Sequence, residues 1–383
     1  MCRIFFYLLT FLFVSTEVFS QDLNYAKKTI NTLTSSTYWG RGYTNNGMAK
    51  AADFIESEFK SFGLIPLDTK GFKQSFSFPV NTFPKDMKLE INGKALKPGR
   101  DFIVHQASKG VNTTTNLIPK DSATYLSAQA SVVLSIQPKL TWSVAQQPMD
   151  YTLIEVTNKS LPGIPKTIKA EITNQVIPNF TAANVIGMVK GTTKPDSILV
   201  FTAHYDHLGG MGNSTYFPGA NDNASGVALL LDLARYYAKN PSKYSIVFIA
   251  FAAEEAGLLG SKYFTENPLF PLNHIRFLWN LDLMGNGDAG ATVVNATLHT
   301  KEFALLHKIN DANQYLVKIN PRGKAANSDH YYFTEKGVPA FFMYTQGGVS
   351  AYHDIDDIAA TLPLTSYQQI FKLLVTFNQQ LIN

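Results

Sequence analysis

The chain has 383 residues, of which 45% are hydrophobic and 13% aromatic, enough for one large α/β domain with a substantial core and a smaller second domain. The formal net charge of +4 is spread along the chain without a basic run. The sequence is therefore that of a folded protein, and it does not indicate nucleic acid or an anionic membrane as a partner.

The N-terminal segment, residues 1–20, has the pattern of a secretory signal. A basic start precedes the apolar run Ile4–Val14, and the small residue Ser20 ends the segment. We expect cleavage after Ser20 and export to the periplasm or the extracellular space. A membrane anchor is the alternative, but the run is shorter than the roughly 20 residues that span a bilayer. Because Cys2 is the only cysteine, the exported chain would depend on its core rather than on disulfides.

Two helices are predicted in residues 21–83, which form the first part of the main domain. Leu23–Leu33 has helical composition, and a helix with apolar residues at helical spacing from Met48 to Phe59 should end at Gly63. Between them, Thr34–Asn46 is expected to be a polar loop whose residues Trp39 to Tyr43 are exposed. Both helices should cover the main sheet.

Residues 84–177 are expected to form a β-rich inserted subdomain. Short β-rich runs such as Ser131–Ile136 recur between turn residues, and Asn92-Gly93 is a hairpin signal. The main domain resumes at residue 178 and continues to residue 383. At its end, Thr365 and Gln368 have the spacing of a capping box before an amphipathic closing helix.

Polar side chains follow four apolar runs of strand length in the main domain. The runs are Ile198–Thr202, Ser245–Phe251, Ile275–Leu281 and Pro339–Tyr344. The polar residues after them are His204 and Asp206, Glu254 and Glu255, Asp282, and Tyr352 and His353. In an open α/β sheet the working crevice lies outside the carboxyl ends of the strands, so these side chains should meet there. A helix from about Ser225 to Ala238 should connect the first two strands.

Carboxylates and imidazoles without a thiolate suit one or two divalent cations, zinc first and manganese or cobalt as alternatives. Asp206 should share a face with His204, so that its carboxylate can orient the imidazole. Asp282 is an acid inside an apolar run and needs a partner. Of the adjacent Glu254 and Glu255, one can bind a cation while the other faces the attacking water.

Five motifs occur in order along the main domain. They are His-Tyr-Asp-His-Leu-Gly from His204, Gly-Ala-Asn-Asp-Asn-Ala-Ser-Gly from Gly219, Phe-Ala-Ala-Glu-Glu-Ala-Gly-Leu-Leu-Gly-Ser from Phe251, Leu-Asp-Leu-Met-Gly from Leu281, and Ser-Asp-His-Tyr-Tyr-Phe from Ser328 with a later Tyr352-His353. Together they resemble the M28 family of co-catalytic zinc aminopeptidases, over roughly residues 22–75 and 180–383.

The resemblance implies a phosphorylase/hydrolase-like fold, a mixed and mostly parallel sheet flanked by helices, with two bound zinc ions. The implied roles are one zinc ion held by His204 and Asp282, a second held by Glu255 and His353, Asp222 as the bridge, Glu254 as general base, and Tyr352 as a donor to the carbonyl oxygen in the transition state. From its position alone, Asp222 could instead be a turn or N-cap residue. The family also implies a cis Asp222-Asn223 bond and, in many relatives, a protease-associated insert.

Other residues of these motifs are not among the implied ligands. Asp329 and His330 match the family's Asp-His motif and are expected to lie behind the ligands or in the pocket, while His207 has no predicted role. Relatives often have a histidine and an aspartate where this chain has Val349-Ser-Ala, a departure that concerns the substrate pocket.

The sequence as a whole predicts an exported aminopeptidase that acts on peptides, without stable membrane insertion. A water activated by two cations would lose its proton to Glu254 and attack the scissile carbonyl. A single-zinc glutaminyl cyclase and a non-catalytic binding ectodomain of the same fold are the alternatives. Because residues 84–177 supply no ligand, the metal site is expected to survive changes there.

Overall fold

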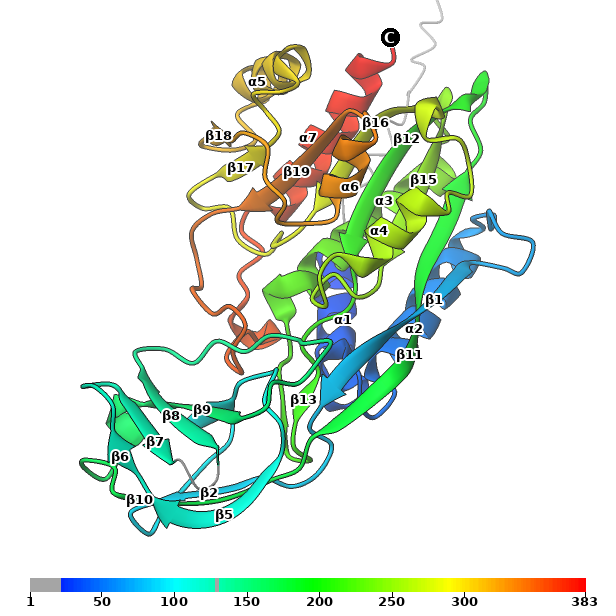
Figure 1. Cartoon of the computed structure of the whole chain (residues 1–383). Coiled ribbons are helices and arrows are strands. Elements are labelled where there is room, and N and C mark those ends of the chain that lie inside the picture. The colour runs from blue at the N-terminus through cyan, green and yellow to red at the C-terminus, as the bar shows by residue number, and fades with distance from the viewer. Residues whose placement is uncertain (1–21, 128–130) are drawn as a thin grey trace, which may run out of the picture.

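The computed structural model describes residues 22–127 and 131–383, so the predicted signal segment 1–20 lies outside the described residues. Figure 1 shows an α/β part, with a β-rich inserted unit in cyan and teal below it. Among the described residues, none of the helices is long and apolar enough to cross a membrane.

The α/β part is built on one mixed sheet with the strand order β1-β11-β15-β12-β16-β19-β17-β18. Its strands are β1 Lys73–Thr82, β11 Gln175–Val189, β12 Lys194–His204, β15 Tyr244–Phe251, β16 Ile275–Leu281, β17 Ala291–Val294, β18 Ile319–Pro321 and β19 Ala340–Thr345. The neighbours β15, β12, β16 and β19 are parallel, while β11 runs antiparallel to β1 and β15. The predicted mixed, mostly parallel sheet is confirmed.

Helices cover both faces of this sheet (Figure 1). They are α1 Leu23–Leu33, α2 Gly47–Phe62, α3 Gly226–Lys239, α4 Leu259–Glu266, α5 Thr300–Asn313, α6 His330–Glu335 and α7 Tyr367–Leu381. Helices α1, α2, α3, α5 and α7 share one hydrophobic core, and α4 and α6 lie on the opposite face. Within β12, Leu199 and Phe201 belong to the first core while Ile198 and Val200 belong to the second. Burial on both faces explains why this strand is a continuous apolar run.

The inserted unit contains two antiparallel-rich sheets between β1 and β11. One has the order β3-β2-β10-β5 and the other β4-β9-β8-β7-β6. Their bounds are β2 Lys88–Ile91, β3 Lys94–Leu96, β4 Phe102–Val104, β5 Val111–Asn116, β6 Ile118–Pro119, β7 Thr124–Ser127, β8 Val132–Gln137, β9 Thr152–Thr157 and β10 Thr167–Ile172. The predicted hairpin turn is present, with Asn92 and Gly93 both at positive φ between β2 and β3.

The core of the inserted unit continues into the α/β part. Leu208, Met211 and Phe217 follow β12 in the chain, yet they pack with the apolar residues of the insert. Met211 lies in the short strand β13 Gly210–Met211, which pairs with β14 Thr215–Tyr216. The two parts of the molecule therefore meet through a packed interface close to the end of β12.

One local prediction is wrong and another is not tested. The closing helix α7 begins at Tyr367 with Ser366 before it, and the Ser366 hydroxyl donates to the carbonyl of Gly287, while the capping box of Thr365 and Gln368 stays a prediction. The stretch from Gly40 to Tyr43 is buried rather than exposed. A Cβ at Gly40 would lie 2.4 Å from the carbonyl oxygen of Phe217, so only glycine allows this close approach.

Candidate metal centre

The predicted strand-end residues meet at one edge of the sheet. His204 is the last residue of β12, Asp282 directly follows β16, and Glu254 follows β15, which pairs with β12. The loop after β19 brings His353 to the same place. They line a cavity of about 170 Å³ whose walls are His204, Asp222, Glu254, Glu255, Asp282, Leu283, Asn327, Phe342, Tyr344, Tyr352 and His353.

The two carboxylate oxygens of Asp222 face two different groups. Oδ1 of Asp222 lies 3.4 Å from Nε2 of His204, which lies 3.4 Å from Oδ1 of Asp282. We call this group the His204 position. Oδ2 of Asp222 lies 3.2 Å from Nε2 of His353, which lies 3.3 Å from Oε2 of Glu255. We call this second group the His353 position. Asp222 is thus shared between two sets of possible ligands.

These spacings fit zinc. Two ligand atoms bound at about 2.0–2.1 Å to one tetrahedral ion lie about 3.3 Å from each other. Oδ1 of Asp282 is buried and has no hydrogen-bond partner among the described residues, while Oδ2 accepts a hydrogen bond from Ser328. A cation at the His204 position would satisfy the unpaired oxygen, so the residues present fit a divalent metal ion.

Both imidazoles present Nε2 to the candidate ligands. Nδ1 of His204 lies 3.2 Å from the carbonyl oxygen of Asp206, and Nδ1 of His353 lies 2.9 Å from the carbonyl oxygen of Trp142. Since a carbonyl oxygen only accepts hydrogen bonds, the proton of each neutral ring is on Nδ1. This tautomer leaves the Nε2 lone pair of each ring free for a cation.

Asp206 has a different main contact from the one expected. Its carboxylate lies 3.8 Å from Nδ1 of His204, beyond hydrogen-bond distance. It accepts instead the backbone N–H groups of Glu254 and Glu255, at 3.1 and 3.2 Å. Asp206 therefore fixes the turn that carries the two glutamates, and its backbone carbonyl, rather than its side chain, orients the imidazole.

The two adjacent glutamates point to different surroundings. Glu255 faces His353, whereas Glu254 offers a carboxylate oxygen within 4.8 Å of the ligand atoms of His204 and Asp282. Burial raises the pKa of Glu254 well above its usual value, and the carboxylates of Glu255 and Asp329 add to the rise. A carboxyl group with a raised pKa is suited to accept a proton near neutral pH.

The family can be assigned from the sequence. The model of peptidase family M28 matches residues 184–378, which include every residue of the two positions. The chain belongs to peptidase family M28. It is 33% identical over 164 residues to aminopeptidase YwaD of Bacillus subtilis, covering 42% of this chain and 35% of that protein. It is 36% identical over 112 residues to a probable zinc metalloprotease of Leptosphaeria maculans, covering 28% of this chain and 26% of that protein.

Solved structures of similar fold extend over most of this M28 chain. A zinc aminopeptidase from Bacillus subtilis has a TM-score of 0.68 at 20% identity, covering 93% of this chain and 94% of that one. An aminopeptidase from Aneurinibacillus sp. strain AM-1 has a TM-score of 0.65 at 20% identity, covering 94% of each chain. At this level of identity the likeness concerns the fold, and it includes the region of the inserted unit.

The peptide bond Asp222-Asn223 is cis, as the resemblance to family M28 led us to expect. Three residues without glycine's freedom also have a left-handed backbone beside the ligands: Ala253 at φ +59, Leu283 at φ +56 and His353 at φ +54. Left-handed conformations of residues other than glycine persist only where the surroundings hold them, and they are common at functional sites.

Several residues that support this M28 site were not predicted from the sequence. Asp357 accepts the backbone N–H groups of Asn221 and Asp222 at 2.9 and 3.0 Å, and so holds the loop of the shared carboxylate. Nδ1 of His207 lies 2.8 Å from Oε1 of Glu255, which orients that side chain. The sequence signal for His207 is its place within the first motif, whereas no motif includes Asp357.

Arg41 is fully buried, and each hydrogen bond of its guanidinium to the described residues goes to a backbone carbonyl group. It donates to the carbonyl oxygens of Leu33, Tyr205, Pro218, Gly219 and Asp222, at 2.6–3.2 Å. Burial lowers its pKa to about 10, so the guanidinium keeps its charge at neutral pH. Arg41 therefore ties helix α1 to the loops that carry His204 and Asp222.

Tyr352 lines the cavity of the ligands, whereas Asp329 and His330 do not. The ring of Tyr352 stacks on that of His353, with ring centroids 4.0 Å apart, and 45% of the residue is exposed. Burial of its hydroxyl and the carboxylates of Asp222 and Glu255 raise the pKa of Tyr352, which keeps it a proton donor. Asp329 and His330 are both fully buried, and the His330 ring lies 5.2 Å, between ring centroids, from Phe342 of the cavity wall.

Proposed function

We propose that this M28 protein is an aminopeptidase that binds two zinc ions and removes N-terminal residues from peptides. The observation that supports it most is the arrangement around Asp222, whose two oxygens each face one histidine and one further carboxylate at 3.2–3.4 Å. The matched segments span 35% and 26% of the two named relatives, which are called an aminopeptidase and a probable zinc metalloprotease.

The chain's own residues have distinct roles in this proposal. Zinc ions held at the two positions would supply Lewis acidity, which lowers the pKa of a water molecule and polarises a carbonyl group. Glu254 accepts the proton of the attacking water and returns it to the leaving amine. Tyr352 donates a hydrogen bond to the carbonyl oxygen as negative charge develops on it.

The cavity also suggests which N-terminal residues are accepted. Beside the ligands its walls are Leu283, Phe342 and Tyr344, together with the amide side chain of Asn327. A pocket with these walls favours an apolar or aromatic N-terminal side chain over a charged one.

A combined zinc and substrate assay tests the proposal. The purified protein is expected to contain two zinc ions per chain and to hydrolyse leucyl and phenylalanyl substrates faster than glutamyl ones. The Glu254→Gln variant, purified in parallel, controls for contaminating peptidases. One zinc ion with conversion of N-terminal glutamine to pyroglutamate would support a glutaminyl cyclase instead. Two zinc ions with no turnover of any peptide would indicate a binding domain.

We propose further that the protein is exported. The support is the apolar run Ile4–Val14 with a basic start before it and the small residue Ser20 after it. N-terminal sequencing of the protein recovered from outside the cytoplasm of an expressing cell should begin at Gln21. Recovery in the cytoplasm with Met1 retained would contradict export.

A further inference from the structure

One segment of the inserted unit departs from ordinary β structure. Strands β8 and β9 are parallel neighbours, and the segment 138–151 connects them. Parallel strands need a crossover connection, which is usually a helix. All of segment 138–151 is described, and it contains neither helix nor strand. Long irregular connections inside compact domains are commonly functional. We call residues 139–146 the strap.

The strap bonds directly to the loop of His353. The backbone N–H of Trp142 donates to the carbonyl oxygen of His353 at 2.9 Å, and Nδ1 of His353 lies 2.9 Å from the carbonyl oxygen of Trp142. Lys139 adds an ion pair with Asp354 at 2.9 Å. The segment that follows β19 runs down from the sheet toward the inserted unit (Figure 1). This path brings the loop of His353 against the strap.

Side chains anchor the strap to both parts of the molecule. The indole Nε1 of Trp142 donates to the carbonyl of Val104 in the insert at 2.7 Å, and its ring stacks on Phe217 with centroids 4.7 Å apart. Only 5% of Trp142 is exposed. Val144 packs against the cores of both parts, and Gln146 donates to the carbonyl of Ala256, close to the two glutamates.

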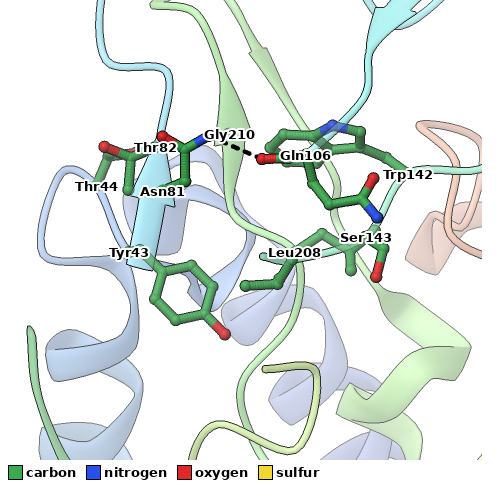
Figure 2. A pocket seen from close by; sticks show the side chains of 10 residues that line it. Tyr43, Thr44, Asn81, Thr82, Gln106, Trp142, Ser143, Leu208 and Gly210 are labelled. Carbon is green, nitrogen blue, oxygen red and sulfur yellow. Dashed lines mark hydrogen bonds between the residues drawn. The ribbon is translucent and has the colours of Figure 1, made fainter. Parts of the chain in front are cut away.

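The space beneath the strap is small, and both polar and apolar residues line it. A cavity of about 10 Å³, with room for about one water molecule, is lined by Trp142 and Ser143 from the strap and by Tyr43 and Leu208 from the α/β part. Figure 2 shows Tyr43 and Asn81 on one side of it and Trp142 and Leu208 on the other. The hydroxyl of Tyr43 is buried without a hydrogen-bond partner among the described residues. The strap is therefore held by the apolar side chains of Leu140, Trp142 and Val144, with a small cavity beside them.

We infer that the strap is a positioning element for the metal centre: through the Trp142 carbonyl it fixes the tautomer and orientation of His353, and so sets cation affinity at the His353 position. The inference rests on the two-zinc proposal above. His353 needs such support because its own backbone is left-handed, at φ +54, and it belongs to no strand or helix. Loss of the group that orients a metal-binding histidine typically costs 10- to 100-fold in metal affinity.

Zinc titration of apo-protein variants, followed by calorimetry, tests the inference. In Trp142→Ala the anchors at Val104 and Phe217 are lost, so affinity for one of the two ions should fall by roughly 10- to 100-fold while the other ion binds as in the wild type. Trp142→Phe keeps the ring stacking, so its zinc affinity should lie between those of Trp142→Ala and the wild type. Ile91→Ala removes a fully buried side chain from the other sheet of the insert and serves as the matched control. It should lower the melting temperature but keep both affinities.

Trp142→Ala that folds and binds both ions with wild-type affinity would overturn the inference. An equal loss in Ile91→Ala would do the same, because it would reflect general destabilisation of the insert. If Trp142→Ala does not fold, Lys139→Ala removes a half-exposed partner of Asp354 and should weaken the same ion by a few-fold. Unchanged zinc affinity in Lys139→Ala would then overturn the inference that the strap positions His353. Wild-type protein that binds only one ion would contradict the two-zinc proposal itself, so the two failures are distinguishable.

Discussion

At the His204 position, Nδ1 of the imidazole faces the carbonyl of Asp206, two residues further along the chain, and the ligands follow adjacent strands. At the His353 position, Nδ1 faces the carbonyl of Trp142 in the inserted unit, and the histidine lies on an irregular loop. One half of the centre thus has His204 and Asp282 at the ends of adjacent strands, while the other depends on a contact between two parts of the molecule. From this difference we infer, in place of the prediction from the sequence that the metal site survives changes in residues 84–177, that an insert without any ligand can still support a metal site.

The largest loss of zinc and of activity is expected from a change at Asp222, which the two positions share. Asp222→Ala removes the carboxylate whose two oxygens face His204 and His353, so it should weaken both positions together. Zinc content should fall from two ions per chain toward none, and activity should be lost. Metal analysis after dialysis measures this. Loss of a single ion would mean that Asp222 serves only one position.

Replacing each of the adjacent glutamates in turn should distinguish the general base from the zinc ligand. Glu254→Gln keeps the size of the side chain but removes the proton acceptor, so turnover should fall by roughly 10²- to 10⁴-fold with both ions retained. Glu255→Gln should weaken only the His353 position, with partial recovery of activity in excess zinc. Rate and metal content of the two variants, measured side by side, check this. The reverse pattern would exchange the two roles.

Much of the His204 half could be predicted from the sequence. Apolar runs of strand length followed by His204 or Asp282 carry the information locally, because parallel strands end at one edge of a sheet. The contacts of Trp142 and Asp357 could not be predicted from the sequence. The backbone carbonyl of Trp142 faces His353, and the carboxylate of Asp357 accepts the backbone N–H of Asn221; in both cases the two residues are far apart in the sequence and the contact involves backbone atoms. The burial of Arg41 was not predicted, because a charged side chain in a glycine-containing loop usually lies at the surface.

A smaller effect is expected from Tyr352→Phe on the His353 side. The change keeps the ring that stacks on His353 and removes only the hydroxyl. If this hydroxyl donates to the developing oxyanion, kcat should fall by up to about 10²-fold, the lower end of the range for such donors, because Tyr352 is half-exposed. Zinc content should stay at two ions. Unchanged kcat would assign Tyr352 to packing against the imidazole.

The smallest effect should come from the insert away from the strap. Ile164 is 71% exposed and lies between β9 and β10. Ile164→Ser should change the free energy of unfolding by no more than about 0.5 kcal/mol and leave both zinc affinities unchanged. Denaturant unfolding and zinc titration check this. Loss of zinc from this variant would show that the insert supports the site through more than the strap.

Diffraction data from zinc-loaded crystals, recorded on both sides of the zinc absorption edge, test the central claim most directly. We predict two anomalous peaks per chain, one between Oδ1 of Asp222 and the His204–Asp282 pair and one between Oδ2 of Asp222 and the His353–Glu255 pair. A single peak, or two peaks that do not share Asp222, would contradict it.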